Sequence, residues 1–434
     1  MIWNPEAEAM PREQMEALQL DRLRETVARV LAAGTPLSER LRAAGIGAGE
    51  DIRSLADLHR LPFSHKSDLR DHYPFGLFAV PPDQLVRIHA SSGTRGKPTV
   101  VGYTRHDLDV WDEVMARCLV MAGVRPGMIA HNAYGFGLFT GGFGFHQAAE
   151  FLGCVVVPVG GGMTQRQVML LQDLGAQVLF ATPSFALSIA EEIERAGIDR
   201  RSLKLEVGVF GAEPWTEEMR GEIERRLGLQ AMNMYGLSEI VGPGVAAECA
   251  EGWGGSHIQE DHFLPEVVDP ETSESLPPGE EGELVFTTLT KEALPLIRYR
   301  TGDISSLQTG QCACGRTTVR MSRIKGRYDD MLIVRGINLY PSEVERILLG
   351  SGEVAPYYQL VLDRPRALDE LTVLCEAARD DLDRDQLAIR LVRALQAETG
   401  LTMTVQVLPR DGVPRSDGKA IRVVDHRPRA GIRS

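Results

Sequence analysis

Apolar residues in the middle of the chain form short continuous runs that alternate with longer amphipathic segments. Cys154 to Pro158 reads as a buried strand, Val178 to Ala181 and Leu205 to Phe210 read as further strands, and Gln230 to Met234 is a strand-like run. The segments between them, from Arg166 to Leu174, after Ser184 and after Pro214, carry apolar residues at helical spacing. Ser184 is placed to cap the second helix, and Pro214 to occupy the first turn of the third. Repeated β-α units predict a parallel sheet with helices on both faces.

The two ends of the chain depart from this pattern. Residues 12 to 75 are mostly helical with polar faces, and Thr104-x-x-Asp107 marks the start of a further helix. From Leu284 the strands become short and hairpin-like, and beyond Asp329 strands and helices alternate in a separate unit. We therefore predict an α/β fold with two domains. Residues 1–328 hold the parallel layers and a β-rich subdomain, and residues 329–434 form a small mobile α+β domain that hinges at Asp329.

Composition and charge narrow the class of protein. The 434 residues are 43% hydrophobic and 25% charged, which is ordinary for a globular protein, and the formal net charge is -13. That charge disfavours nucleic acid and an anionic membrane as partners, and no apolar run reaches the ~20 residues that span a bilayer. The N-terminus lacks a secretion-signal pattern, and 6 cysteines are too few for a disulfide scaffold, so we expect a cytoplasmic location. A homodimer is left open.

The strongest single motif is the loop Ser91-Ser92-Gly93-Thr94-Arg95-Gly96-Lys97-Pro98. It combines hydroxyls, glycines and an ammonium group between two strand-like runs. Glycines let backbone N–H groups come close to oxygen atoms, and loops rich in such donors bind phosphate. The loop is not of the G-x-x-x-x-G-K-[ST] type, because no Ser or Thr follows Lys97. Taken alone, it is also compatible with a polar hairpin turn.

Three further fragments carry polar groups at points where ligands bind to parallel sheets. Gly211-Ala212-Glu213-Pro214 ends a strand and opens a helix, and Tyr235-Gly236-Leu237-Ser238-Glu239 offers an aromatic face, a hydroxyl and a carboxylate. Thr301-Gly302-Asp303 places a carboxylate in a turn, where it can accept hydrogen bonds from the two hydroxyls of a ribose. Each fragment is a weak signal alone, and their order and spacing together make a strong one.

With these motifs the chain resembles the acyl-adenylate-forming enzymes, namely acyl-CoA synthetases, adenylation domains and luciferases, and most closely the phenylacetate–CoA ligase family. The resemblance covers essentially the whole chain. It also rests on Arg298 to Asp303, Gly326 to Gly336 and Arg415-Ser416-Asp417-Gly418-Lys419. Features more particular to the phenylacetate branch are Trp3-Asn4-Pro5-Glu6, Ala133 to Gly142 and Cys312-Ala313-Cys314-Gly315. Arg95 departs from the threonine usual in the family and adds a positive charge to the loop.

The resemblance implies a two-step reaction. ATP and a carboxylic acid give acyl-AMP and pyrophosphate, and the thiol of coenzyme A then displaces AMP. The resemblance further implies that the small domain rotates about Asp329 between the steps. Lys419 would leave the site, and the 330–340 segment would enter it to meet coenzyme A.

The resemblance also implies roles for particular residues. The loop residues Ser91, Ser92, Gly93, Thr94, Gly96 and Lys97 would hold the β- and γ-phosphates of ATP. Glu239 would hold Mg²⁺, Asp303 the ribose hydroxyls, and Arg327 would reach the ribose–phosphate region. Tyr235 and the backbone of Gly211, Ala212, Glu213 and Pro214 would face the adenine, with Gly236, Ser238 and Asp329 counted among the nucleotide-binding residues. Lys419 would bridge the attacking carboxylate and the ribose–phosphate oxygens.

Ala133-Tyr134-Gly135-Phe136-Gly137-Leu138-Phe139 places aromatic residues among glycines after a strand. Glycines leave room for a planar ring and aromatic side chains stack on it, so we expect Tyr134, Phe136 and Phe139 to bind the ring of an aryl or arylacetic acid. Phenylacetate is the first choice, anthranilates and other substituted benzoates stay open, and His146 or Gln147 is placed to contact a ring substituent. An aromatic core cluster is the plainer interpretation. The G-x-G pattern is not read as a dinucleotide turn, because no acidic residue follows about 20 positions later.

Cys312-x-Cys314, with Cys249 and His257 in the loop after the Tyr-Gly-Leu-Ser-Glu motif, supplies three sulfurs and one imidazole. This is the donor set of a closed structural Zn²⁺ site. His262 is an alternative to His257, and four unrelated residues in surface loops are the plainer interpretation.

Two other functions remain open. One is an adenylating enzyme that passes the acyl group of an aromatic acid to a carrier-protein thiol or an amine. The other is a nucleotide-binding sensor without turnover, against which Glu239, Asp303 and Lys419 argue because all three suit catalysis.

Overall fold

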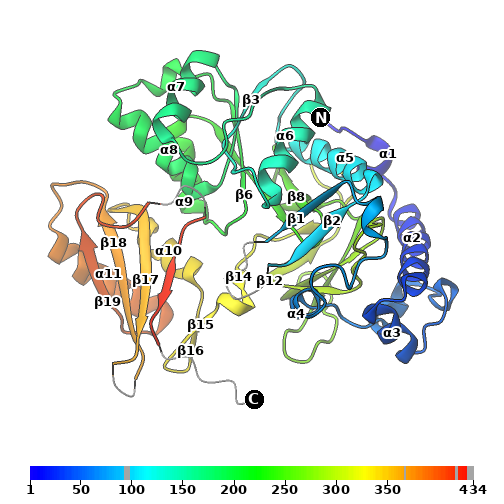
Figure 1. Cartoon of the computed structure of the whole chain (residues 1–434). Helices are drawn as coiled ribbons and strands as arrows, with labels where there is room; N and C mark the ends of the chain where they lie inside the picture. Colours follow the sequence, from blue (N-terminus) through cyan, green and yellow to red (C-terminus); the bar gives the residue numbers. More distant parts are fainter. Residues whose placement is uncertain (92–97, 366–367, 416–418, 428–434) are drawn as a thin grey trace.

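One long mixed sheet organises the larger lobe of the computed structural model, which describes residues 1–91, 98–365, 368–415 and 419–427 (Figure 1). Its parallel strands are β3 (Ile129–Asn132), β4 (Val155–Val157), β5 (Val178–Ala181), β6 (Val207–Gly211) and β7 (Gln230–Leu237). The antiparallel part consists of β8 (Gly242–Cys249), β9 (Gly252–Ile258), β10 (Phe263–Val268), β11 (Glu281–Thr288), β12 (Tyr299–Gln308), β13 (Arg320–Met321) and β14 (Gly326–Arg327). The strand order is β10-β11-β12-β13-β9-β8-β7-β6-β5-β3-β4, with β14 paired to β12.

Helices cover both faces of the parallel part, as the sequence predicts. The helices are α5 (Arg105–Met121) and α6 (Thr140–Leu152) on one face, and α7 (Thr164–Leu174), α8 (Pro183–Arg195) and α9 (Glu217–Leu227) on the other. In β5, Val178 and Phe180 join the core beneath α5 and α6, whereas Leu179 and Ala181 join the core beneath α7 to α9. Because alternate residues of a strand face opposite ways, a fully apolar strand is what a doubly covered sheet requires.

Three local predictions change in the structure. Thr182, not Ser184, caps α8, because its hydroxyl accepts from the N–H of Phe185. Helix α9 starts at Glu217 under a Thr216 cap, so Pro214 lies before the helix. Strand β4 is at the sheet edge with Val155 58% exposed, so the expected buried strand is wrong there. The Thr104–Asp107 start of α5 is confirmed as a capping box.

The N-terminal region is mostly helical up to residue 75, as predicted. Its helices are α1 (Pro5–Glu8), α2 (Arg12–Ala33), α3 (Pro36–Ala43) and α4 (Lys66–Asp71), with short 3-10 turns η1 (Gly49–Asp51), η2 (Leu55–Arg60) and η3 (Pro82–Gln84). Leu23 and Val27 of α2 pack with Leu264 of β10 and Leu289, which places these helices over the antiparallel end of the sheet. The hairpin β1 (Arg87–Ala90) and β2 (Val100–Tyr103) flanks the loop motif.

The C-terminal lobe, coloured yellow to red in Figure 1, has its own sheet and its own core. After η4 (Arg200–Ser202) in the large lobe and η5 (Tyr328–Asp330) at the junction, its elements are β15 (Leu332–Val334), β16 (Ile337–Leu339), α10 (Pro341–Gly350), β17 (Val354–Asp363), β18 (Glu370–Ala377), α11 (Arg384–Thr399), β19 (Thr404–Leu408) and β20 (Val423–Asp425). The sheet order β19-β18-β17-β20 confirms the predicted α+β character. No helix in the described part of the chain is long and apolar enough to cross a membrane.

Candidate active site

A cavity of about 410 Å³ lies between the two lobes, within the usual range for small-molecule sites. Residues from both lobes line it. Of the residues predicted to bind the nucleotide or act in catalysis, its lining contains Ser91, Gly211, Ala212, Glu213, Pro214, Tyr235, Gly236, Ser238, Glu239, Asp303, Arg327 and Lys419. Ser91 and Lys419, which are 328 positions apart in the sequence, therefore line the same cavity.

The floor of the cavity is formed where β6 and β7 end side by side. The two strands are parallel, with Gly211 in register with Met234, so the segments that follow them leave the same edge of the sheet. A Cβ atom on Gly211 would lie 2.2 Å from the carbonyl oxygen of Met234, which explains the glycine there. Ala212 follows with φ +72, a conformation that side chains rarely adopt. A strained backbone at a ligand-facing turn is common at functional sites.

Asp303 lies in strand β12, not in the turn expected from the sequence. Thr301 holds the local bend, because its hydroxyl donates to the carbonyl of Leu284 and accepts from the N–H of Asp303. The Tyr235 hydroxyl donates to Asp303 Oδ2 at 2.6 Å, and Arg327, directly opposite on β14, has its Nε 3.9 Å from Oδ1. Burial raises the pKa of Asp303, while Arg327 opposes that shift. Tyr235 and Arg327 therefore hold the carboxyl group of Asp303 at the cavity wall, with its Oδ2 atom already hydrogen-bonded.

Glu239 is buried at the cavity wall and faces Lys66, a residue that the sequence reasoning missed. Lys66 Nζ lies 3.3 Å from Glu239 Oε1, and no hydrogen bond to that oxygen comes from any described residue. Lys66 begins α4, far from every recognised motif in the sequence. The only sequence signal is a lysine at a helix start after Ser64-His65, which is too common to predict a site.

Lys419 enters the cavity from the small lobe. Its Nζ lies 5.5 Å from the centre of the Phe139 ring. Desolvation lowers the pKa of Lys419, and the charge of Glu213 opposes this shift most strongly. Arg327 lowers the same pKa further, and Glu239 raises it. The ammonium group therefore lies among both cations and anions at the point where the lobes meet.

The aromatic segment reaches the cavity only in part. Tyr134 and Phe139 line it, and Tyr134 stacks on Phe145, also in the lining, with ring centres 4.7 Å apart. Phe136 and His146 are described but do not line it, so the structure does not place them at the predicted acid site. Phe136 is 39% exposed, and His146 Nε2 lies 3.3 Å from Glu150 one turn along α6. Phe145, next to His146 in α6, is buried and contributes to the cavity wall.

Some predicted residues cannot be placed in the cavity. Ser92, Gly93, Thr94, Gly96 and Lys97 lie outside the described residues, as do positions 416–418 of the lysine motif. Asp329 is part of η5, and its neighbour Asp330 lines the cavity.

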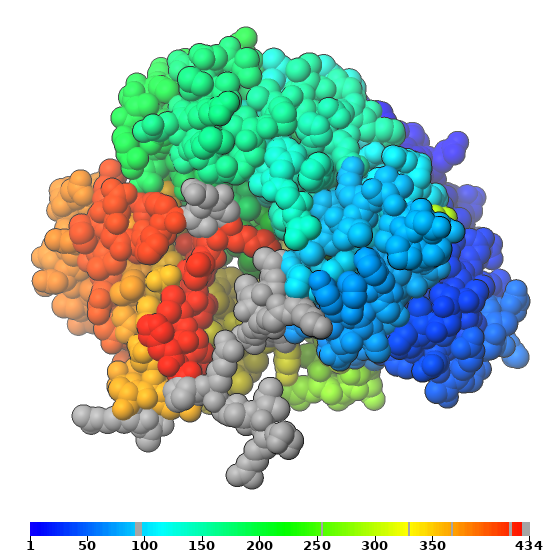
Figure 2. Space-filling model, viewed as in Figure 1, coloured from blue at the N-terminus to red at the C-terminus, as the bar shows by residue number. Residues whose placement is uncertain are grey.

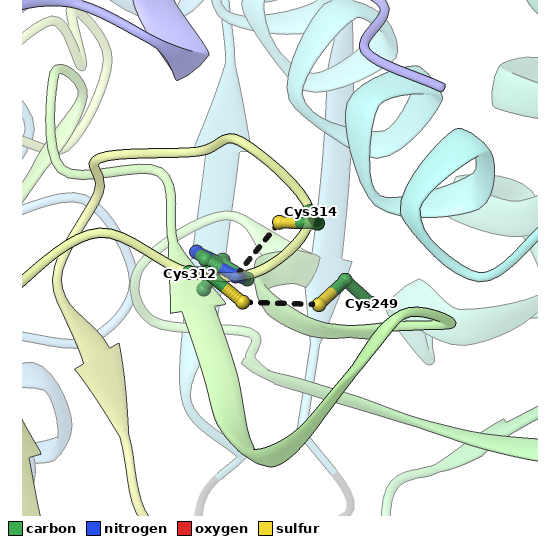
Figure 3. A group of neighbouring side chains, drawn as sticks. Cys249, Cys312 and Cys314 are labelled. Carbon is green, nitrogen blue, oxygen red and sulfur yellow. Dashed lines mark hydrogen bonds between the residues drawn. The ribbon is translucent and has the colours of Figure 1, made fainter.

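The predicted cysteine and histidine ligands form a cluster in the large lobe. The ligand atoms of Cys249, His257, Cys312 and Cys314 all lie within 4.8 Å of one another. Figure 3 shows the three sulfurs directed toward one another. Cys249 Sγ is 3.7 Å from Cys312 Sγ, and Cys314 Sγ is 3.5 Å from His257 Nε2. Cys249 ends β8 and His257 lies within β9, so these two residues occupy adjacent strands and not the loop expected from the sequence.

Two features of the structure position the side chains of this cluster and keep the space between them clear. The other ring nitrogen of His257 is 2.9 Å from the Thr318 hydroxyl, which orients the imidazole so that Nε2 points at the sulfurs. A Cβ atom on Gly252 would lie 2.5 Å from Cys312 Sγ and 2.9 Å from Cys249 Sγ, so only glycine leaves this space clear. His262 lies elsewhere, with Nδ1 2.8 Å from the Thr290 hydroxyl.

Sequence comparison then identifies the family. The profile of the AMP-binding enzymes matches residues 21–289, and that of the AMP-binding enzyme C-terminal domain matches residues 336–427. The phenylacetate-coenzyme A ligase of Thermus thermophilus is 52% identical over 98% of this chain and 100% of its own length. That of Escherichia coli is 48% identical over 96% and 95% of the two lengths. The chain belongs to the phenylacetate–CoA ligase family of AMP-binding enzymes. It is therefore an AMP-forming acid–CoA ligase.

Solved structures of a related ligase in two states differ in how closely they match this AMP-binding enzyme. It matches 2-hydroxyisobutyryl-CoA ligase in the postadenylation state with a TM-score of 0.91, at 28% identity over 98% of this chain and 92% of that chain. The same ligase in the thioesterification state, with CoA, matches with a TM-score of only 0.73 over the same shares of the chains. The present structure is therefore closer overall to the postadenylation state of that ligase than to its thioesterification state.

Proposed function

We propose that the enzyme joins an arylacetic acid, phenylacetate first, to coenzyme A at the expense of ATP. The observation that carries this proposal is the convergence of Glu239, Asp303, Arg327 and Lys419 on one cavity whose other wall is aromatic. The coenzyme A acceptor is preferred over a carrier-protein thiol or an amine, because relatives 47–52% identical are phenylacetate-coenzyme A ligases.

In the first step a carboxylate oxygen of the acid attacks the α-phosphorus of ATP, and the bond to the bridging oxygen breaks to release pyrophosphate. Catalysis of this step is mainly alignment and neutralisation of the growing negative charge. Lys419 would contact the attacking carboxylate and the α-phosphate oxygens. Asp303 would accept hydrogen bonds from the ribose hydroxyls. The hydrogen bond that Tyr235 donates to one carboxylate oxygen of Asp303 would fix the orientation of the carboxylate for this contact.

In the second step the sulfur of coenzyme A attacks the carbonyl carbon of acyl-AMP. The bond to the phosphate oxygen breaks, AMP leaves, and the thiol proton passes to solvent. Lys419 lies in the cavity in the present arrangement, so the small lobe would turn about Asp329 to exchange it for the 330–340 segment. The division into residues 1–328 and 329–434 is part of this proposal.

Mg²⁺ fits the residues around Glu239. Glu239 lines the cavity, and its buried Oε1 atom accepts no hydrogen bond from the described residues. Such an oxygen suits Mg²⁺, a hard cation that prefers carboxylate and phosphate oxygen atoms. Glu239 would hold the ion, which would neutralise phosphate charge when bound, and Lys66 would give way to it or share the phosphates.

We also propose a structural Zn²⁺ at Cys249, His257, Cys312 and Cys314. A tetrahedral zinc with sulfur at about 2.3 Å and nitrogen at about 2.0 Å requires S–S edges of about 3.8 Å and S–N edges of about 3.5 Å. Two of the six edges, 3.7 Å between Cys249 Sγ and Cys312 Sγ and 3.5 Å between Cys314 Sγ and His257 Nε2, match these values, and all four ligand atoms lie within 4.8 Å of one another. Four protein ligands leave no open position, so the ion would hold strands together without taking part in the reaction.

A pyrophosphate-release screen over aryl and arylacetic acids, each with and without coenzyme A, tests the proposed function. We expect acid-dependent release that is strongest for phenylacetate, and formation of the thioester only when coenzyme A is present. Release with no aromatic acid, or thioester formation from benzoates but not from phenylacetate, would contradict the proposed substrate class.

A further inference from the structure

Two carboxylates of the large lobe hold the segment that carries Lys419, one on each side of it. Glu191 of α8 accepts from Arg415 Nε and Nη2, both at 3.1 Å. Glu213 accepts from the backbone N–H of Ala420 at 2.8 Å, and its other oxygen accepts from the N–H of Ser184 at the start of α8. Lys419 therefore lies between two anchor points on the larger lobe. Figure 2 shows the two lobes in contact, with the orange and red atoms of the small lobe against the green atoms of the large one.

The small lobe holds Arg415 independently of this contact. Its guanidinium donates to Glu376 of β18 at 2.6 and 3.0 Å and lies 3.4 Å from the centre of the Tyr357 ring of β17. Glu376 is fully buried, so the small lobe fixes the direction in which the guanidinium points. Planar bidentate contacts of this kind are geometrically specific as well as strong.

Glu191, by contrast, accepts hydrogen bonds from two side chains of the described residues, and both belong to the small lobe. Besides Arg415, the Tyr357 hydroxyl donates to it at 3.3 Å. Arg415 and Glu191 have side chains only 23% and 22% exposed, so solvent screens the pair only in part. Partial burial raises the pKa of Glu191, but the hydrogen bonds and the charge of Arg415, together with the charge of Arg226 and the Tyr357 hydroxyl, hold this pKa below its ordinary value. If the small lobe turned away, Arg415 would keep Glu376, whereas Glu191 would lose both donors.

We propose that Glu191 and Arg415 form a latch between the lobes that keeps Lys419 in the cavity during acid activation and opens for the coenzyme A step. Glu191 acts as a positioning residue, because it touches Arg415 and not the reacting atoms. This inference rests on the proposed two-step function. The latch stabilises only one arrangement of the lobes, so it affects the two steps unequally.

Measuring the two half-reactions separately tests the latch. In Glu191→Gln, acid-dependent exchange of pyrophosphate into ATP should fall about 5- to 30-fold, the effect of one or two kcal/mol on the population of the latched arrangement. Formation of the thioester from added acyl-AMP and coenzyme A should stay at the wild-type rate or rise. Arg415→Lys keeps the charge but not the bidentate geometry, and we expect it to lose less exchange activity than Glu191→Gln.

Glu194→Gln is the matched control. It removes the same charge from the same helix, but Glu194 binds Arg226 of the large lobe at 2.8 Å. Both half-reactions should be unchanged in this control. Equal loss of both half-reactions in Glu191→Gln, or loss of neither, would overturn the latch while the proposed function stands. Wild-type enzyme without acid-dependent exchange would overturn the proposed function and the latch with it.

Discussion

The cavity and the Cys/His cluster are both assembled from residues far apart in the sequence, yet they are held in different ways. The cluster lies entirely in the large lobe, on the neighbouring strands β8 and β9 and the turn that contains Cys312 and Cys314. The cavity is incomplete without Lys419, which comes from the other lobe. The proposed metal ligands thus come from one lobe, whereas the proposed catalytic lysine comes from the lobe that we propose to move between the two steps.

This difference leads to distinct expectations. Changes at the part of the cavity that comes from the small lobe should separate the two half-reactions, because in the proposed reaction each of them uses its own arrangement of the lobes. Changes in the cluster should weaken the folded protein and so lower both half-reactions together.

Lys419→Ala should give the largest effect. Removing a cation that neutralises charge in the transition state costs about 3–4 kcal/mol, so acyl-AMP formation should fall about 10²- to 10³-fold. Thioester formation from added acyl-AMP should stay close to the wild-type rate, because the proposed rotation would remove Lys419 from the site before this step. Rapid-quench measurement of each half-reaction checks this, with the exposed Lys204→Ala as control. Acyl-AMP formation at the wild-type rate would contradict the role of Lys419.

Cys312→Ser should break the cluster. We expect loss of the bound zinc and a lower free energy of unfolding, by about 3 kcal/mol or more, because a structural metal contributes directly to folding. The turn that carries Cys312 also holds the N-terminus, since Arg316 forms a fully buried ion pair with Glu8 and donates to the carbonyl of Met1 at 2.8 Å. Metal analysis and thermal unfolding measure the two effects.

Cys154→Ser provides the control for the cluster, because Cys154 lies outside it. Its zinc content and unfolding temperature should match those of the wild type. Purified wild-type protein without zinc, or a Cys312→Ser variant that loses only one half-reaction, would contradict a purely structural metal site.

Asp329→Pro should lower the half-reaction that Lys419→Ala spares, namely thioester formation. Proline fixes φ and so stiffens the proposed hinge. Acyl-AMP formation should be spared, while thioester formation falls about tenfold or more, equivalent to about 1.4 kcal/mol. Asp329→Ala removes the same carboxylate but keeps the backbone free, and should retain both activities better. Equal loss of both steps in Asp329→Pro would count against rotation at this residue.

The sequence predicted the layered sheet well, because its signals are local. Apolar runs such as Val178 to Ala181 favour strands buried on both faces, although the run at β4 lies at the sheet edge, and capping residues such as Thr104 mark a helix start within one turn. Where two capping residues compete, as Thr182 and Ser184 do, the sequence does not decide which hydroxyl reaches the N–H groups.

The cavity was predicted where motifs carry it and missed where only tertiary packing does. Lys66 meets Glu239 because α4 lies against the end of β7, and no spacing in the sequence records that contact. The sequence did not predict a role for Glu191 for the same reason, because its ion-pair partner Arg415 belongs to the other lobe. Their closeness to Tyr134 in the sequence suggested Phe136 and His146 for the acid site, but neither residue lines the cavity.

The smallest expected effect is the pH dependence of acyl-AMP formation, which also belongs to the movable side of the comparison. Desolvation lowers the pKa of Lys419 from its ordinary value of 10.5. A lysine acts here as a cation, so its contribution is complete below its pKa and is lost as the pH rises through it. The rate should therefore decline at a lower pH than an ordinary lysine would give, by up to about tenfold per pH unit above the pKa.

The value of kcat/KM for ATP reports the free enzyme, in which the pKa of Lys419 has not yet been raised by bound phosphates, so this constant should be measured against pH. Lys419→Arg is the decisive comparison, because a guanidinium stays protonated throughout the alkaline range. The variant should be slower than the wild type at every pH but should lack the alkaline decline. If the decline persisted unchanged in Lys419→Arg, another group would be titrating. The cation delivered by the small lobe would then not be the one that limits acid activation at high pH.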